Sequence, residues 1–187
     1  RRQRQMCIRD RIIGMTKITL RKIVTSLIGS IMPLAMFAGQ DNVAPQAKVS
    51  VSDILGIGFE ARNLVDGKVM YANEGEWACK GSVTSWGVMH LPWAQLDWDN
   101  EIDVDRIVLY DRVSELEHLA GGTLHFSDGS KVSVTAIPND GSPKEVCFPS
   151  KKIKWVRFEA TDGAGKNIGL SEIEVFRTRG ENTEYVE

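Results

Sequence analysis

The side chains best suited to ligand chemistry stand at the end of a short apolar run. Residues 105–112 contain four consecutive apolar residues and end in the pair Asp111-Arg112. Arginine offers a planar fork of donors and aspartate offers acceptors, and the hydroxyl groups of a sugar need both. We therefore predict that Arg112 binds a ligand and that Asp111 positions it. The alternative is a simple ion pair at the end of a strand.

A tryptophan and a histidine in a long loop extend this set. Residues 71–92 are rich in turn-forming residues and include Trp86 and His90. An exposed indole can stack on the apolar face of a sugar ring, although most Trp side chains fill the core. We predict ligand contacts at Trp86 and His90, with a place in the core as the alternative for Trp86. The same preference assigns three other tryptophans to the core: Trp77, Trp93 and Trp155.

The sequence contains no motif of a known catalytic site. Gly-x-Ser-x-Gly, His-Glu-x-x-His and the phosphate-binding loop are all missing from the 187 residues. The three histidines, at positions 90, 118 and 125, do not have the spacing of metal ligands. A pair of acids for glycoside hydrolysis needs only proximity in space, but no pair is singled out. We therefore predict that the protein is not an enzyme.

The first 38 residues differ in character from the rest. Residues 1–11 resemble the translation of a widely used transposon sequencing adapter and are interpreted as an assembly artefact. The alternative is a basic arm for nucleic acid or anionic lipid. Residues 15–38 have a basic start, an apolar stretch and small residues at the end, which is typical of a signal peptide. The apolar stretch is short of the roughly 20 residues of a membrane span, so an uncleaved anchor is the less favoured interpretation. Export to the periplasm, the cell surface or the medium is predicted.

Removal of this segment makes the protein acidic. Eight of the 23 Lys and Arg residues, but only one of the 25 acidic residues, precede residue 39, which leaves a formal charge of −9. A nucleic-acid backbone favours a basic surface, so we do not expect nucleic acid as a partner. An acidic surface is compatible with a cation site and equally with solubility alone.

Two cysteines follow the predicted signal, at positions 79 and 147. An exported domain can oxidise such a pair. Cys147, however, lies between Val146 and Phe148, which should point inward, so its thiol should face the other way. A bridge and two separate thiols are both left open.

The spacing of apolar residues predicts an all-β fold. Alternating or continuous apolar segments of strand length are separated by turn signals such as Asp66-Gly67 and Asp128-Gly129. About eight strands are expected, with a short helical turn over residues 61–65 and a polar tail over 178–187. The expected strands cover residues 48–52, 94–98, 105–111, 122–126, 131–136, 145–148, 155–160 and 170–176. This pattern is typical of an antiparallel sandwich.

Several segments resemble one family. Residues 93–98 (Trp-Ala-Gln-Leu-Asp-Trp), 106–112 and 170–176 resemble strands of discoidin-like domains, also called coagulation-factor type C or galactose-binding-like domains. Residues 75–78, 108–112, 121–130, 138–141 and 169–176 together resemble a bacterial branch of this family that is often attached to PIG-L-like sugar deacetylases. The match covers residues 44–177. It implies an eight-stranded antiparallel jelly-roll β-sandwich that binds ligands, usually sugars, at loops on one rim.

The resemblance also implies a structural calcium ion. Calcium takes six to eight oxygen ligands from carboxylates and backbone carbonyls. The Asp-Gly turn could present carbonyls of Asn63, Asp66 and Lys68, and the resemblance adds the carboxylates of Asp66 and Glu172. Glu174 shares a face with Glu172 and is the alternative. A turn aspartate and a solvent-facing strand glutamate, without a metal, are the simpler interpretation.

Together these features predict a non-catalytic, exported carbohydrate-binding module that recognises a glycan or a cell-surface polysaccharide through rim loops. The alternatives are an envelope adhesion or structural module that binds a protein, and an accessory domain of a sugar deacetylase or glycoside hydrolase. A carbohydrate-active enzyme is therefore a possible partner.

Overall fold

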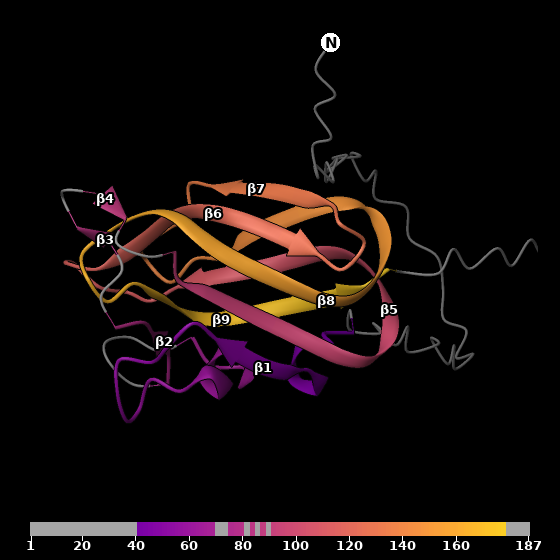
Figure 1. The fold of residues 1–187 in the computed structure, drawn as a ribbon, viewed down its shortest axis with the longest axis horizontal. Helices are drawn as coiled ribbons and strands as arrows, with labels where there is room; N and C mark the ends of the chain where they lie inside the picture. The colour runs from indigo at the N-terminus through magenta and orange to yellow at the C-terminus, as the bar shows by residue number, and fades with distance from the viewer. Residues whose placement is uncertain (1–40, 70–74, 81–82, 85–86, 89–90, 179–187) are drawn as a thin grey trace, which may run out of the picture. The chain divides into compact units, whose positions relative to one another are not determined.

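The computed structural model describes residues 41–69, 75–80, 83–84, 87–88 and 91–178. Within these residues the chain forms nine strands and two short 3-10 helices, with no α-helix (Figure 1). The elements are η1 (Ala44–Gln46), β1 (Lys48–Val51), η2 (Ala61–Val65), β2 (Trp77–Ala78), β3 (Val83–Thr84), β4 (Gly87–Val88), β5 (Trp93–Asp111), β6 (His118–Phe126), β7 (Lys131–Thr135), β8 (Lys144–Ala164) and β9 (Gly169–Arg177).

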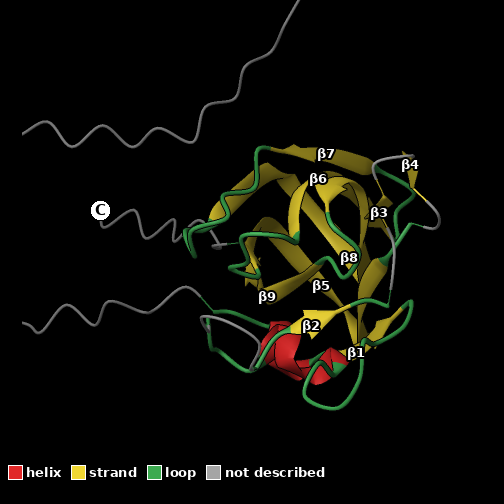
Figure 2. Ribbon diagram, turned by 90° about the vertical axis from the view of Figure 1, so that its left-hand side faces the viewer, coloured by secondary structure: helices red, strands yellow, loops and turns green. Residues whose placement is uncertain are grey.

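Two long strands connect the layers of the sandwich. All strand pairs are antiparallel, in the order β2-β9-β5-β8-β6-β7, with β1 also on β5 and a separate β3-β4 pair. The first part of β5 pairs with β1 and with the end of β8, whereas its second part pairs with β9 and with the start of β8. The β5–β8 register is irregular between Asp97 and Ile102, where both strands bend. The view in Figure 2 shows the two layers, with both 3-10 helices on the side of β1.

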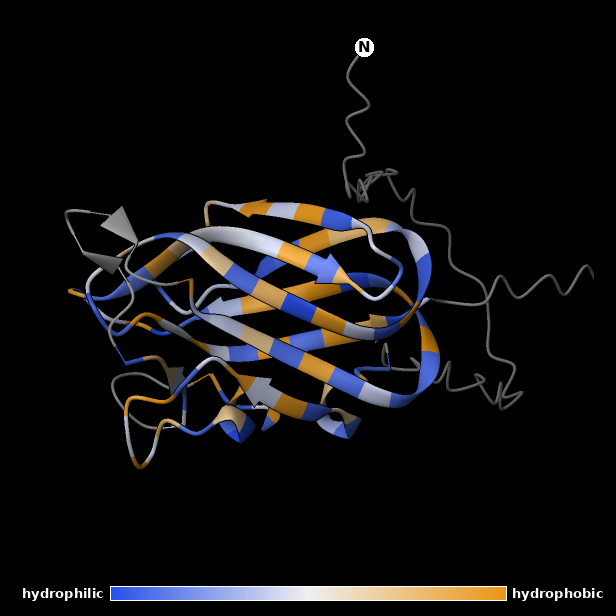
Figure 3. Cartoon of the chain, viewed as in Figure 1, coloured by the Kyte–Doolittle hydropathy of each residue, from blue (hydrophilic) through white to orange (hydrophobic). Residues whose placement is uncertain are grey.

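The core lies between these layers. Alternate residues of each strand point inward, and Figure 3 shows the corresponding alternation of polar and apolar bands. Leu96, Val156 and Phe158 are buried on one layer, and Ile107, Leu109 and Val175 on the other. Trp98 is buried too, and its indole N–H donates to the Val43 carbonyl at 2.9 Å, which satisfies its only polar group.

The predicted all-β antiparallel sandwich is confirmed, including the central position of residues 105–111 between β8 and β9. Four of the expected strands, however, join into two long ones: residues 94–98 and 105–111 both lie in β5, and residues 145–148 and 155–160 both lie in β8. The polar segment 99–101 interrupts the apolar pattern because it is the exposed outside of a bend, not a loop. The predicted hairpin at residues 127–130 and the helical turn at 61–65 are also confirmed.

Two of the tryptophans assigned to the core are on the surface, so that prediction was wrong. Trp77 is buried, but Trp93 and Trp155 are half-exposed on the outer face of β5 and β8. The reason is the alternation of the strand: Leu96 and Val156 point inward, and Trp93 and Trp155 each lie an odd number of residues away. The local period outweighs the general tendency of Trp to be buried.

The two cysteines do not bridge each other. Cys79 is buried, and its sulfur lies 4.0 Å from the Lys166 carbonyl oxygen. Cys147 is exposed on β8 between the buried residues Val146 and Phe148, as the alternation predicted. Among the described residues no helix has the length and apolar character needed to cross a membrane.

The buried centre of β5 gives a direct test of this packing. Leu109 is fully buried, whereas Leu116, in the loop after β5, is 81% exposed. Leu109→Ala should lower the free energy of unfolding by about 2–5 kcal/mol, because it leaves a cavity in the core. Leu116→Ala should change it by less than about 0.5 kcal/mol. Urea denaturation of both variants measures the difference, and equal effects would contradict the packing described.

Candidate functional site

Loops from four parts of the chain are tied together at one end of the sandwich, the left-hand end in Figure 1. The Leu55 N–H donates to the Ala78 carbonyl, and the Trp77 indole donates to the Asp53 carbonyl, so residues 53–60 are joined to residues 75–80. These two loops, with residues 112–118 and 164–168, are called here the rim. The same end of the fold receives the end of β5.

A buried guanidinium joins these loops. Arg112 is only 2% exposed and directly follows the last residue of β5. Its Nε and Nη2 lie 2.9 Å from Glu76 Oε1, and its Nη1 lies 2.9 Å from Glu117 Oε2. Nη1 also donates to the Asn167 carbonyl, and the guanidinium lies 5.8 Å from the centre of the Phe59 ring. Arg112 thus contacts all four loops of the rim.

Glu117 extends the network. Its Oε1 accepts hydrogen bonds from the backbone N–H and side-chain amide of Asn167, at 3.3 and 2.9 Å. One carboxylate therefore links the loop after β5 to the loop before β9. Glu76 and Glu117 are not among the predicted site residues, because they lie 36 and five residues from Arg112 in the sequence. No pattern in the sequence joins the three.

Asp111 is fully buried and performs a different task. Both of its carboxylate oxygens lie 3.2 Å from the backbone N of Leu119, the second residue of β6. Burial raises the pKa of Asp111 to about 8, although the hydrogen bonds from the backbone and the charge of Arg112 oppose the rise. Asp111 therefore fixes where the loop returns to the sheet.

The geometry gives Arg112 and Asp111 a positioning role within the rim. The guanidinium is surrounded by Glu76, Glu117 and Asn167, and both residues are buried. Direct contact of Arg112 with a ligand stays a prediction, and such a ligand would have to displace existing partners. Trp86 and His90, the other two predicted contacts, lie outside the described residues.

The predicted metal residues meet at a second place. The Gly67 N–H donates to Glu172 Oε2 at 3.2 Å, so the Asp66-Gly67 turn lies against β9. Lys68 closes the turn: its backbone N–H donates to Asp66 Oδ1, and its ammonium lies 3.4 Å from Asp66 Oδ2. Asn63 lies in η2, and its side-chain amide donates to the carbonyls of Gly58 and Glu76.

Glu172 is the residue here that is best suited to a cation. It is 2% exposed, and its Oε1 is buried without a hydrogen-bond partner among the described residues. Burial raises the pKa of Glu172 to about 8, and the charges of Asp66 and Glu174 add to the rise. Glu174 instead accepts a hydrogen bond from the Tyr110 hydroxyl at 3.2 Å. This settles which of the two glutamates faces the turn.

These residues are compatible with a calcium ion, with one restriction. No group of three or more His, Cys, Asp and Glu side chains in the described part of the chain is arranged to hold a metal. A calcium ion at Glu172 would therefore depend on backbone carbonyls of the turn, which calcium accepts readily. The buried, partnerless Oε1 is the observation that fits such an ion.

The antiparallel sandwich with loops gathered at one end has a galactose-binding-like fold. The chain belongs to the family described as "Domain of unknown function (DUF7402)", which matches residues 42–176. A search of the curated proteins found no match.

Solved structures with this fold include several sugar-binding modules. One is chitosan-binding module 1 from the chitosanase/glucanase of Paenibacillus sp. IK-5, with 24% identity, a TM-score of 0.56 and coverage of 73% of this chain and 98% of the module. Another is a fucose-binding module of Streptococcus pneumoniae, with 19% identity, a TM-score of 0.60 and coverage of 75% and 98%. A third is the lectin domain of lectinolysin in complex with Lewis b antigen, with 22% identity, a TM-score of 0.59 and coverage of 74% and 98%. At these identities the similarity establishes the fold.

The contribution of the buried ion pairs of Arg112 to stability can be compared with that of an exposed ion pair in the same chain. Arg112→Gln should lower the free energy of unfolding by about 3–5 kcal/mol, because it leaves buried carboxylates without their cation. Arg177, whose Nε lies 2.9 Å from Asp41 Oδ2, is exposed. Arg177→Gln should cost less than about 1 kcal/mol. Chemical denaturation of both variants measures the costs, and a loss below 1 kcal/mol for Arg112→Gln would refute its role as the link between the loops.

Proposed function

We propose that residues 44–177 form a non-catalytic, exported carbohydrate-binding module that recognises glycans through its rim. The observation that carries the proposal is the rim itself: four loops fastened to one another by a buried ion network at one end of a galactose-binding-like sandwich. Such loops are pre-organised, so binding a ligand costs little conformational entropy. The fold neighbours support this, since they are described as binding chitosan, fucose and Lewis b.

Trp86 and His90, which lie outside the described residues, are the proposed ligand contacts: the indole as a stacking surface and the imidazole as a hydrogen-bonding group. Arg112 and Asp111 hold the rim loops together. Export is proposed from the signal-like residues 15–38, and a link to a carbohydrate-active enzyme is supported by the chitosan-binding module, which derives from a chitosanase/glucanase.

A protein-binding envelope module is the second candidate. Ile57 and Leu116 are 99% and 81% exposed in two rim loops, and exposed apolar side chains favour a protein surface as partner. A glycan competitor distinguishes the two functions, because it would release a glycan-bearing partner from the rim and leave a protein contact intact.

Glycan binding is tested on an array that includes fucosylated, galactosylated and chitosan oligosaccharides. The protein should bind at least one class, and Trp86→Ala and His90→Ala should each weaken that binding about tenfold or more, because aromatic and polar anchors dominate such sites. Lys152→Ala is the control, since Lys152 is exposed on β8 near the turn at residues 127–130, at the other end of β6 from the rim. If no glycan binds at millimolar concentration, the proposal fails.

We also propose that a calcium ion binds beside Glu172 and the Asp66-Gly67 turn, with carbonyls of Asn63, Asp66 and Lys68 as further ligands. The ion would supply the positive charge that the buried carboxylate lacks among the described residues. Its role would be to fasten η2 to β9.

Calcium should therefore stabilise the folded protein. At a concentration about a hundred times its Kd, a ligand of the folded state alone adds about 2.7 kcal/mol to the free energy of unfolding. Excess chelator should lower the Tm accordingly, and Glu172→Gln should abolish the response. Glu174→Gln is the matched control two residues along β9 and should keep it. Identical melting curves with calcium and with chelator would exclude the site.

A further inference from the structure

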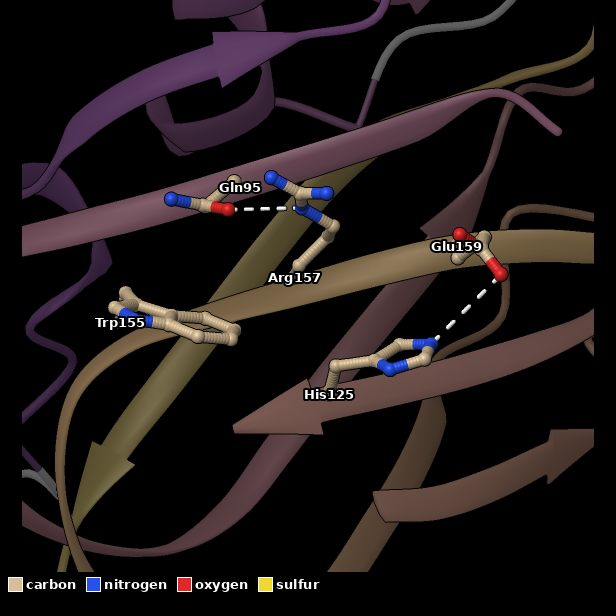
Figure 4. Close-up of a pocket in the computed structure, with 5 residues that line it drawn as sticks. All are labelled: Gln95, His125, Trp155, Arg157 and Glu159. Atoms are coloured by element: carbon tan, nitrogen blue, oxygen red, sulfur yellow. Dashed lines mark hydrogen bonds and ion pairs between the residues drawn. The ribbon is translucent and has the colours of Figure 1, made fainter. Parts of the chain in front are cut away.

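A hollow of about 550 Å³ lies on the outer face of the sandwich, away from the rim loops. It is lined by Gln95 of β5, by Trp155, Arg157 and Glu159 of β8, and by His125 of β6 (Figure 4). Its volume lies within the range of roughly 300–1,000 Å³ that is typical of small-molecule sites. Residues of three neighbouring strands therefore form one concave surface.

The register of the strands fixes the positions of these side chains. Gln95 lies opposite Arg157, and Arg157 lies opposite His125, so the three form a row across β5, β8 and β6. Trp155 and Glu159 flank Arg157 at two residues on either side and share its face. A site built on paired strands is held more rigidly than one on loops, so these groups are already in place before a ligand arrives.

Arg157 is oriented by its neighbours. Its Nε donates to Gln95 Oε1 at 2.8 Å, and its guanidinium stacks 4.2 Å from the centre of the Trp93 ring. The described residues provide no hydrogen-bond acceptor for either Nη group. A guanidinium held in this way presents two adjacent donors, which match a pair of neighbouring hydroxyl groups.

Acceptors and an aromatic surface complete the hollow. Glu159 Oε1 lies 3.8 Å from His125 Nε2, which is longer than a hydrogen bond, so its carboxylate is available as an acceptor. Trp155 is half-exposed, and it lies on the opposite side of the hollow from Glu159 (Figure 4). An aromatic ring beside fixed donors and acceptors suits a molecule that has an apolar ring face and several hydroxyl groups.

We propose that this face is a second binding site, for an uncharged sugar that stacks on Trp155. Its hydroxyl groups bind the Nη groups of Arg157 and the carboxylate of Glu159. An uncharged ligand is favoured because the opposite charges of Arg157 and Glu159 balance, and a uronic acid would be repelled by Glu159 and by Asp97, opposite Trp155 on β5. The site does not depend on the rim, and with it the module would hold a glycan chain at two points.

The indole N–H signals of the full chain, labelled with 15N-tryptophan, test this site. Fucose, galactose, triacetylchitotriose and cellotriose are titrated to tens of millimolar. At least one should shift the signals of Trp155 and Trp93. That of Trp98 should stay unchanged, because its N–H group donates to the Val43 carbonyl in the core. Trp155→Ala should weaken this binding about tenfold or more.

Arg157→Gln provides a second variant that leaves the indole in place, and it should weaken binding of the same sugar. Lys131→Ala is the control, because Lys131 lies opposite His125 at the end of the same row but outside the hollow. Binding that shifts only the Trp86 signal and is unchanged in Trp155→Ala would overturn the second site and leave the rim proposal intact. Shifts confined to Trp155 and Trp93 would support the second site without the rim.

Discussion

The neutralisation of one buried charge determines how the loop end of this protein is built. A guanidinium removed from water is costly unless carboxylates surround it. Arg112 obtains them from two loops, through Glu76 and Glu117, and adds the Asn167 carbonyl from a third. If one of these loops moved away, the guanidinium of Arg112 would lose a partner, and a buried charge would be left without its counterion. The rim is therefore rigid for an electrostatic reason, although it has almost no regular secondary structure.

The position of that charge follows from the strand before it. Strand β5 is central in the sheet, so its residues Ile107–Leu109 are buried and its direction is fixed by β8 and β9. Arg112 follows immediately after Asp111, which holds the Leu119 N–H at the start of β6. The core thus determines where the guanidinium lies, and the guanidinium determines where the loops lie.

Sequence alone gave a correct fold and an incomplete site, for physical reasons. Alternation of apolar residues is local information, so it located the strands, the hairpin at 127–130 and the outward direction of Cys147. It could not distinguish a bend in β5 from a loop, because exposed polar residues mark both. The same two-residue alternation predicts that Trp93 and Trp155 face outward, whereas the general tendency of Trp to be buried predicts the core. The sequence shows the charged pair Asp111-Arg112 and therefore predicts a ligand contact at Arg112. It does not show Glu76 and Glu117 as partners of Arg112, because only folding brings them together.

Two buried glutamates face the same electrostatic cost, that of removing a carboxylate from water, but their surroundings differ. Glu76 and Glu172 are 1% and 2% exposed, and each would be unstable as a lone carboxylate in the interior. Glu76 has the guanidinium of Arg112 beside it, 2.9 Å from Oε1. Glu172 has a backbone N–H on one oxygen and no hydrogen-bond partner for the other in the described part of the chain, and its neighbours Asp66 and Glu174 are acidic. Its charge must therefore be removed by a proton or balanced by a cation from outside the described residues. The protein thus supplies a cation at one buried glutamate and only more acids at the other, where burial raises the pKa of Glu172.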